Sequence, residues 1–232
     1  MESFDWLFPQ VMELRLTDEL RDRLDRLVTD AGRSTDEVVQ EALTNYFVAL
    51  AAERDLESRA YHEAGHVVVA ALQRLGLRKR GLRIDEKGVG LASVMRKEPD
   101  GSTDVGDDPW RTATIIVAYA GHCAQRRFYP DCDPSSESCD KELAVALENE
   151  MYSEHSERCR IDAELKERSK SIVDEHWHVI EALGKALWAK HWAPQWPADR
   201  RWSHQYREKS VEREEVVSFL SRFGISAVLA EV

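Results

Sequence analysis

Long apolar runs are missing from this sequence. No stretch approaches the roughly 18 apolar residues of a membrane-spanning helix, so we expect no membrane partner. The first ten residues, MESFDWLFPQ, also lack the basic start and apolar stretch of a signal peptide. These absences predict a cytoplasmic protein.

Positive charge is scarce relative to negative charge. The chain has 32 Lys and Arg residues against 43 Asp and Glu residues, which gives a net charge of −11 and a pI near 5.3. A field of that sign opposes broad binding to nucleic acid and to anionic membranes.

Cysteine is sparse and unpaired in the sequence. The four residues Cys123, Cys132, Cys139 and Cys159 form no CxxC pair. In a reducing compartment we expect them to be thiols, with metal ligation as the alternative.

The remaining composition is that of an ordinary globular chain. Hydrophobic residues make up 43% and charged residues 32% of the 232 residues. That length accommodates a catalytic domain and one small module. We expect a mainly α fold with a small β component, divided into a module at residues 1–52 and a larger domain at residues 53–232.

The N-terminal module reads as a strand followed by two helices. Residues 11–17, VMELRLT, alternate between apolar and polar positions, as a half-buried strand does. A helical stripe follows from Leu20 to a closing Gly32. Ser34 or Thr35 then caps a second helix that reaches about residue 49. Because so short a unit cannot bury a core alone, we expect a homodimer through residues 11–49.

The strand MELRLTDEL followed by GRSTDEVVQEAL resembles the ribbon-helix-helix family, in which paired strands often enter the DNA major groove. That resemblance implies that Val11, Glu13, Arg15 and Thr17 face outward. Glu13 places a carboxylate where DNA contact favours a cation. Residues 1–55 hold six Arg, no Lys and thirteen acids, a net charge of −7. We therefore expect that this module dimerises the protein. DNA binding by the module is the alternative.

The second part of the chain alternates helices with loops. AERDLESRAYHEAGHVVVAALQRLG predicts one long helix that ends at Gly76. Leu82 and Ile84 alternate with charged residues, and glycines follow them, so we expect one or two small hairpins. A helix from Pro109 to about Phe128, a helical region at 139–192 and a short last helix over VEREEVVSFLSRF complete the domain.

The stretch HEAGH carries the most specific chemistry in the sequence. His62 and His66 are four residues apart, so a helix places both imidazoles on one face. Their nitrogens can then share one zinc ion. Glu63 sits beside that face and is placed to accept a proton from a zinc-bound water, as a general base. Ala64 and Gly65 between the ligands allow another backbone to approach.

AYHEAGHVVVA resembles the active-site helix of the FtsH-type proteases, which are membrane-anchored AAA+ zinc peptidases. RGLRIDEKGVGLASV, IIVAYAGHCAQRRFY, SSESCDKELAVAL and IVDEHWHVIEALGKALWAK resemble later segments of that family in the same order. The resemblance covers about residues 58–192. It implies a zincin-like helical domain with the activity of a zinc metalloendopeptidase.

The same resemblance implies a third zinc ligand. In that family it is the aspartate of an Asn-Asp-Leu-x-x-Ala-Thr pattern, which matches Asp140. Cys139 and Cys132 are competing ligands, because thiolates bind zinc well. The sequence departs from the family at Gln125, where a glutamate is usual, and at Cys139, where an asparagine is usual.

The sequence has no GxxxxGK[ST] phosphate loop and no room for an ATPase domain. We therefore expect ATP-independent cleavage of peptides or flexible, unfolded protein segments. The alternative is a regulatory protein that binds DNA or a partner and carries a degenerate metal site.

Overall fold

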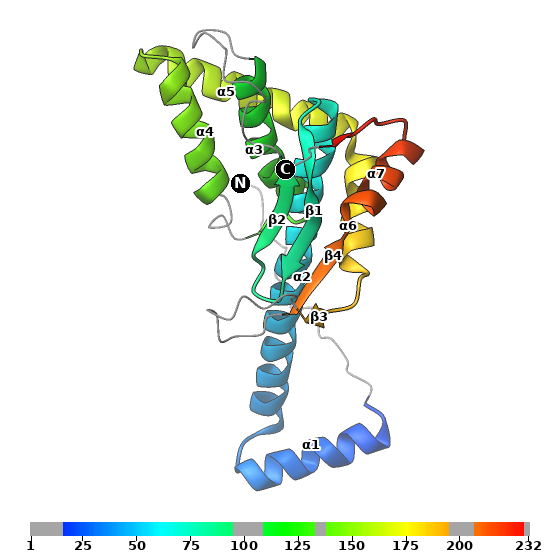
Figure 1. Cartoon of the computed structure of the whole chain (residues 1–232). Helices are drawn as coiled ribbons and strands as arrows, with labels where there is room; N and C mark the ends of the chain where they lie inside the picture. The colour runs from blue at the N-terminus through cyan, green and yellow to red at the C-terminus, as the bar shows by residue number, and fades with distance from the viewer. Residues whose placement is uncertain (1–15, 95–108, 133–137, 195–206, 230–232) are drawn as a thin grey trace, which may run out of the picture. The chain divides into compact units, whose positions relative to one another are not determined.

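A computed structural model describes residues 16–94, 109–132, 138–194 and 207–229 of the chain (Figure 1). Over these residues the fold is mainly α-helical with a small, mostly antiparallel sheet, which agrees with the predicted mainly α fold with a small β component. The chain divides into two compact units, Met1–Ala51 and Ala52–Val232. No helix within the described ranges is long and apolar enough to cross a membrane.

The first unit contains α1, Asp18–Ala31, and the first half of α2, Thr35–Leu72. The Thr17 hydroxyl accepts from the N–H of Leu20 at the start of α1, and Gly32 ends that helix with a φ of 61°. The end at Gly32 matches the prediction, whereas the cap at Thr17 was not predicted. Most of the strand expected at residues 11–17 lies outside the described residues.

Two helices predicted separately form one helix, α2. Between the two predicted segments the sequence VALAAER contains neither glycine nor proline, so nothing interrupts the helical hydrogen bonds. The prediction that Gly76 ends the helix is wrong. The helix ends at Leu72, Arg74 takes a left-handed φ of 60°, and the chain then enters the sheet.

The sheet has the strand order β2-β1-β4-β3. Its strands are β1 Gly76–Asp85, β2 Gly90–Val94, β3 Ala193–Pro194, β4 Arg207–Val211 and β5 Val228–Leu229. The predicted hairpin is confirmed as β1 and β2, which pair antiparallel. The sequence reading missed β4, which pairs with the opposite edge of β1, and β5, which pairs with β1 in parallel.

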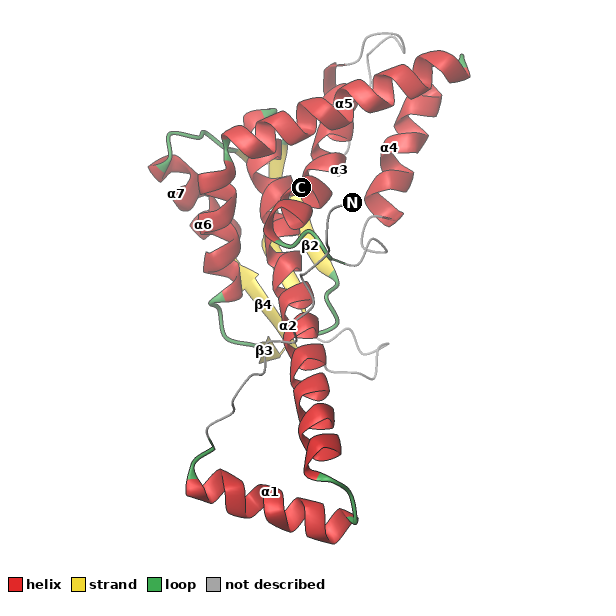
Figure 2. Cartoon of the chain, turned by 180° about the vertical axis from the view of Figure 1, so that it is seen from behind, coloured by secondary structure: helices red, strands yellow, loops and turns green. Residues whose placement is uncertain are grey.

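The remaining helices belong to the second unit. They are α3 Pro109–Phe128, α4 Ser138–Met151, α5 His155–Glu175, α6 Trp177–Trp188 and α7 Arg213–Arg222. The second half of α2 lies behind the strands in Figure 1 and in front of them in the reverse view of Figure 2. It therefore forms a layer against one face of the sheet.

The core of the second unit surrounds this half of α2. Val68 of α2, Leu82 of β1, Ile116 of α3 and Leu183 of α6 are fully buried. A Cβ at Gly65 would lie 2.7 Å from the carbonyl oxygen of Ala120, so the backbones of α2 and α3 touch there. This contact confirms the expected close approach and brings α3 beside the HEAGH turn.

Candidate metal centre

Three side chains from two helices converge on one point. His62 and His66 project from one face of α2, and Asp140 comes from the first turn of α4. Nε2 of each histidine lies 3.0 Å from Oδ2 of Asp140, and the two Nε2 atoms lie 3.0 Å apart. These three residues are the group within the described part of the chain that could hold a metal ion.

The triangle has the dimensions of a metal site. Zinc bonds of about 2.0–2.1 Å in tetrahedral geometry separate neighbouring ligand atoms by about 3.3 Å. The observed 3.0 Å separations need only a small expansion to reach that value. Gly121 of α3 keeps the space beside the triangle open. A Cβ there would lie 2.5 Å from Nε2 of His66 and 2.7 Å from Nε2 of His62.

The tautomer of His66 follows from its backbone contact. Its Nδ1 lies 2.7 Å from the carbonyl oxygen of Val117, which can only accept a hydrogen bond. Nδ1 therefore carries the proton and donates. The Nε2 lone pair is left to face the centre of the triangle, as metal ligation requires.

The tautomer of His62 is fixed by a longer chain of hydrogen bonds. The Ser58 hydroxyl donates to the carbonyl oxygen of Asp55 at 2.5 Å, so its oxygen is left to accept from Gln125 Nε2 at 2.9 Å. This turns the Gln125 oxygen toward Nδ1 of His62, 3.0 Å away. His62 donates from Nδ1 and also offers Nε2 to the centre.

Charge at the centre favours a cation. Burial alone would raise the pKa of the Asp140 carboxyl, but the neighbouring imidazoles of His66 and His62 outweigh it and hold that pKa far below 3.8. Burial would lower the pKa of His66, yet the Asp140 carboxylate reverses the effect and raises it above 6.5. The carboxylate is therefore ionised, and the positive charge that it favours comes either from a second proton on Nε2 of His66 or from a metal ion in that proton's place.

Glu63 lies next to the ligands but outside their triangle. Its side chain is 7% exposed, and the backbone N–H of Ala92 in β2 donates to its carboxylate. Gly90 of β2 is required by this packing, because a Cβ there would lie 2.0 Å from Oε1 of Glu63. Burial raises the pKa of Glu63 more than the two histidines lower it. A buried carboxyl beside a metal site suits proton transfer.

A second polar cluster holds α4, and hence Asp140, against its neighbours. The hydroxyl of Tyr119 in α3 lies 2.5 Å from Asp162 of α5 and 3.2 Å from Glu148 of α4. Glu148 is 4% exposed, and burial, followed by the nearby Asp162, raises its pKa. The cluster links three helices at a point two turns along α4 from Asp140.

The structure brings together the predicted residues His62, Glu63, His66 and Asp140. The competing candidates Cys139, which is exposed, and Cys132, which is buried, are not in the group that could hold a metal ion. Sequence reasoning missed Gly121, although a glycine inside a helix costs about 1 kcal/mol and signals close packing. It gave Ser58 no role, and no motif marks that residue.

Comparison with known proteins gives no relative, since no family model and no curated protein matches the chain.

Proposed function

We propose that this chain is a zinc-dependent metallopeptidase of the HExxH type that hydrolyses peptide bonds without ATP. The observation that carries the proposal is the 3.0 Å triangle of His62, His66 and Asp140 donor atoms, with Gly121 leaving space beside it. The resemblance of residues 58–192 to FtsH-type peptidase domains, which have a zincin-like fold, supports the same function.

The donor set suits zinc. Two imidazole nitrogens and one carboxylate oxygen are a usual catalytic ligand set, which leaves a fourth position open. Zinc bound there supplies a Lewis acid and makes a water molecule far more acidic. Both histidines are held in the ligating tautomer by Gln125 and by the carbonyl of Val117, so the protein presents the ligands ready for the metal.

Glu63 is the proposed general base. It sits one residue from His62, lies close enough to His62, His66 and Asp140 for their charges to act on it, and is not part of the ligand triangle. Its carboxylate is shielded from bulk solvent and positioned by the N–H of Ala92. In that place it accepts a proton from the attacking water and returns it to the leaving amine.

The sheet supports a peptide as substrate. Among the strands that the structure describes, β2 is an outer strand that pairs with β1, and it carries the Gly90 and Ala92 contacts to Glu63. An outer strand can hydrogen-bond an extended peptide through its backbone. Such a peptide would run alongside the general base.

Elemental analysis of purified, zinc-supplemented protein tests the metal site. We expect about one zinc per chain, lost in Asp140→Ala and kept in Cys139→Ala. Absence of zinc from the parent removes the peptidase proposal. Retention of zinc in Asp140→Ala moves the third ligand to another residue.

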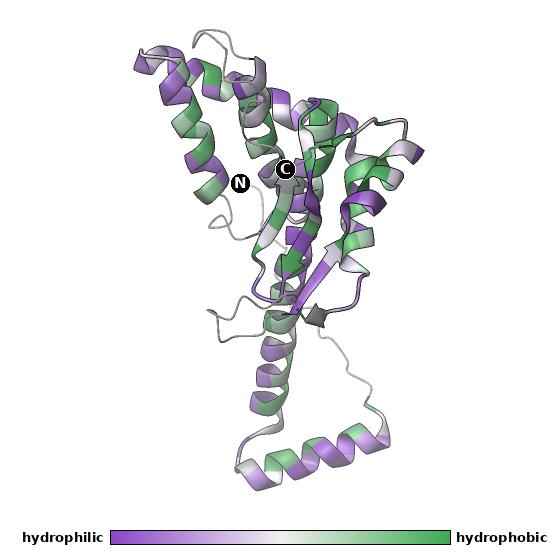
Figure 3. Cartoon of the chain, in the orientation of Figure 1, coloured by the Kyte–Doolittle hydropathy of each residue, from purple (hydrophilic) through white to green (hydrophobic). Residues whose placement is uncertain are grey.

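The N-terminal unit supports a proposal of its own, which is dimerisation. None of the described side chains between residues 16 and 51 is buried. Figure 3 shows hydrophobic residues alternating with hydrophilic ones along α1. In α2, Tyr46 is 61% and Phe47 60% exposed. Exposed apolar surface of this kind is typical of a protein–protein interface. Because the ribbon-helix-helix family dimerises, the resemblance supports a second copy of this chain as the partner.

The alternative function, a DNA- or partner-binding regulator with a degenerate metal site, has weaker support. The site lacks none of the residues that the peptidase proposal requires, since Glu63 lies beside the group formed by His62, His66 and Asp140. Its residues therefore give no sign of degeneration. The acidic N-terminal segment opposes phosphate contact. Weak binding to mixed duplex DNA at about 50 mM salt is the expected result. Tight, salt-sensitive binding that is lost in Arg15→Ala would favour the regulator.

A further inference from the structure

A pocket of about 230 Å³ opens beside the metal centre. Three helices of the second unit line it, with Tyr119 and His122 from α3, Asp140 from α4 and Lys166 from α5 among its residues. Since a water occupies about 30 Å³ of liquid volume, the pocket has room for several waters or one side chain.

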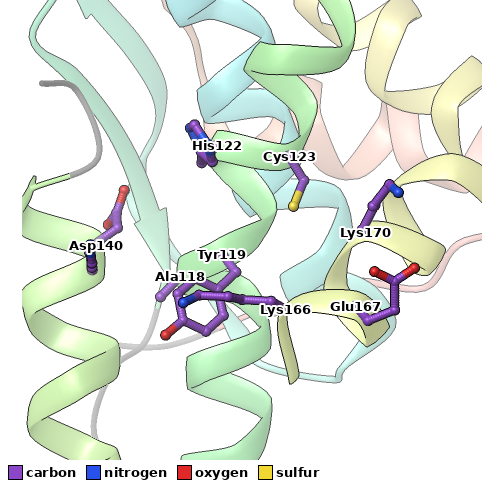
Figure 4. A pocket seen from close by; sticks show the side chains of 9 residues that line it. Ala118, Tyr119, His122, Cys123, Asp140, Lys166, Glu167 and Lys170 are labelled. Atoms are coloured by element: carbon purple, nitrogen blue, oxygen red, sulfur yellow. The ribbon is translucent and has the colours of Figure 1, made fainter. Parts of the chain in front are cut away.

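The pocket is rich in lysine although the chain as a whole is acidic. Lys141, Lys166 and Lys170 line it, against the carboxylates of Asp140 and Glu167. Figure 4 shows Lys166 reaching from α5 across the ring of Tyr119, and its Nζ lies 5.0 Å from the ring centroid. In this position it is also held by Asp162, 2.6 Å away.

Two of these lysines can pair with a ligand without first losing an ion pair within the described part of the protein. In the part of the chain that the structure describes, no ion pair occupies Lys141 or Lys170, and both side chains are exposed. A lysine ammonium group has three N–H donors and no acceptor. The pocket therefore offers cationic donors beside the buried side chains of Ala118 and Tyr119.

The pocket and the metal centre share a wall. Asp140 is both a ligand and a lining residue. Gly121, which packs against both imidazoles, is followed directly by the lining residue His122. An extended peptide advances about 3.3–3.6 Å per residue. A residue close to the bond being cut is therefore the one that would reach the pocket.

We propose that this pocket, lined by Lys141, Lys166 and Lys170, is a substrate subsite that binds a carboxylate of the peptide. The carboxylate is either an Asp or Glu side chain near the cut bond or the C-terminal carboxylate of a short peptide. Both present the same anionic oxygens to the lysines. This inference rests on the proposed peptidase function and adds its substrate preference.

The test begins with zinc-loaded, full-length protein acting on denatured casein, with the cut positions read by mass spectrometry. We expect Asp and Glu to be enriched at one position relative to the cut bond. In Lys170→Glu the ratio of acidic to neutral residues there falls by about tenfold, and lysine and arginine become enriched. Lys185→Gln, on the surface of α6 and outside the pocket, keeps the parent profile.

Two outcomes overturn a subsite for acidic side chains. One is a parent profile without enrichment of Asp and Glu, and the other is an enrichment that survives in Lys170→Glu. Binding of a C-terminal carboxylate is tested separately with short peptides.

Short synthetic peptides distinguish the two sources of the carboxylate. If the C-terminal carboxylate is bound, cleavage occurs at a fixed distance from the peptide end, and amidation of that end removes the preference. If an acidic side chain is bound, replacing Glu by Gln at the enriched position removes it. Insensitivity to both changes overturns the subsite.

A measurement of peptide binding, without cleavage, distinguishes a failure of the subsite proposal from a failure of the peptidase proposal. Calorimetry with zinc-loaded Glu63→Gln protein compares a Glu-containing peptide with its Gln counterpart and with the amidated form of each. Carboxylate-dependent binding that weakens in Lys170→Glu supports the subsite, even if the parent cleaves nothing and the peptidase proposal falls. Equal binding of all four peptides overturns the subsite whether or not cleavage occurs.

Discussion

The side-chain oxygen of Gln125 lies 3.0 Å from Nδ1 of His62. Ser58 holds the Gln125 amide in that orientation from the other side. A glutamine can therefore take the place of a glutamate at this position, because its oxygen accepts a hydrogen bond from Nδ1–H of His62 and leaves Nε2 free to bind a metal ion. The departure from the FtsH-type pattern at Gln125 is compatible with an intact site.

Removing this acceptor should weaken zinc binding. Gln125→Ala leaves His62 free to rotate and to change tautomer, so we expect a 10- to 100-fold loss of zinc affinity. Gln125→Glu keeps an acceptor and should bind zinc within a few-fold of the parent. Competition with a chromophoric chelator measures both affinities. Equal affinity in Gln125→Ala and the parent would show that His62 needs no such support.

Gly121→Ala should abolish zinc binding more completely. The added Cβ would lie 2.5–2.7 Å from both Nε2 atoms, so the two imidazoles would have to move out of the positions in which they face Asp140. Gly32→Ala is the control, because its new methyl group meets nothing within 4 Å and its cost is limited to a strained φ of 61°. Zinc content of the two purified variants is the measurement. A Gly121→Ala protein that retains a full complement of zinc would place the metal elsewhere.

The two candidate ligands His62 and His66 could be anticipated because their spacing encodes their geometry. His62 and His66 must share a helix face at four-residue separation, whatever surrounds them. Asp140 is 74 residues beyond His66, and only the resemblance to a family connected them. Gly121 and Ser58 complete the site through contacts between α2 and α3. A glycine inside a helix signals close packing but does not say which element packs there, and no motif marks Ser58.

The fold was less predictable where tertiary contacts override local signals. Glycine is a common helix end, yet Gly76 begins β1 because its backbone pairs with Val228 in β5. The strand β4 has the sequence REKSV, which has little apolar alternation. It forms because Val211 pairs with the buried Leu82. Pairing partners of this kind lie more than a hundred residues away.

Glu148→Gln should stabilise the protein near pH 7. The raised pKa of Glu148 means that its ionised form is disfavoured in the folded state. Glutamine keeps an oxygen to accept from Tyr119 without the buried charge. We expect the melting temperature at pH 7 to rise by about 2–4 °C, the shift produced by about 1 kcal/mol in a protein of this size.

The gain from Glu148→Gln should depend on pH in a defined direction. Because the folded-state pKa is raised, the ionisation penalty is present above that pKa and disappears as the pH falls below the ordinary value of 4.5. Thermal melts of parent and variant across this range measure it. A variant less stable than the parent at pH 7 would show that the ionised carboxylate is needed.

The dimer proposal predicts that charge on α2 separates the subunits. Leu43 and Phe47 are one helical turn apart and are 36% and 60% exposed. Their joint replacement by glutamate should convert a dimer to a monomer while zinc content stays the same. Thr44→Glu, on the same exposed segment, is the control that should remain dimeric. Light scattering at micromolar concentration decides, and a monomeric parent ends the proposal.

The most direct test of the peptidase proposal compares parent and Glu63→Gln proteins, each loaded with one zinc per chain, in the cleavage of denatured casein. The ligand triangle is untouched in the variant, so metal content and fold should be unchanged. The loss of the general base should reduce turnover by about 10²–10⁴-fold. Cleavage by the variant at the parent's rate, or no cleavage by the zinc-loaded parent, would contradict the account.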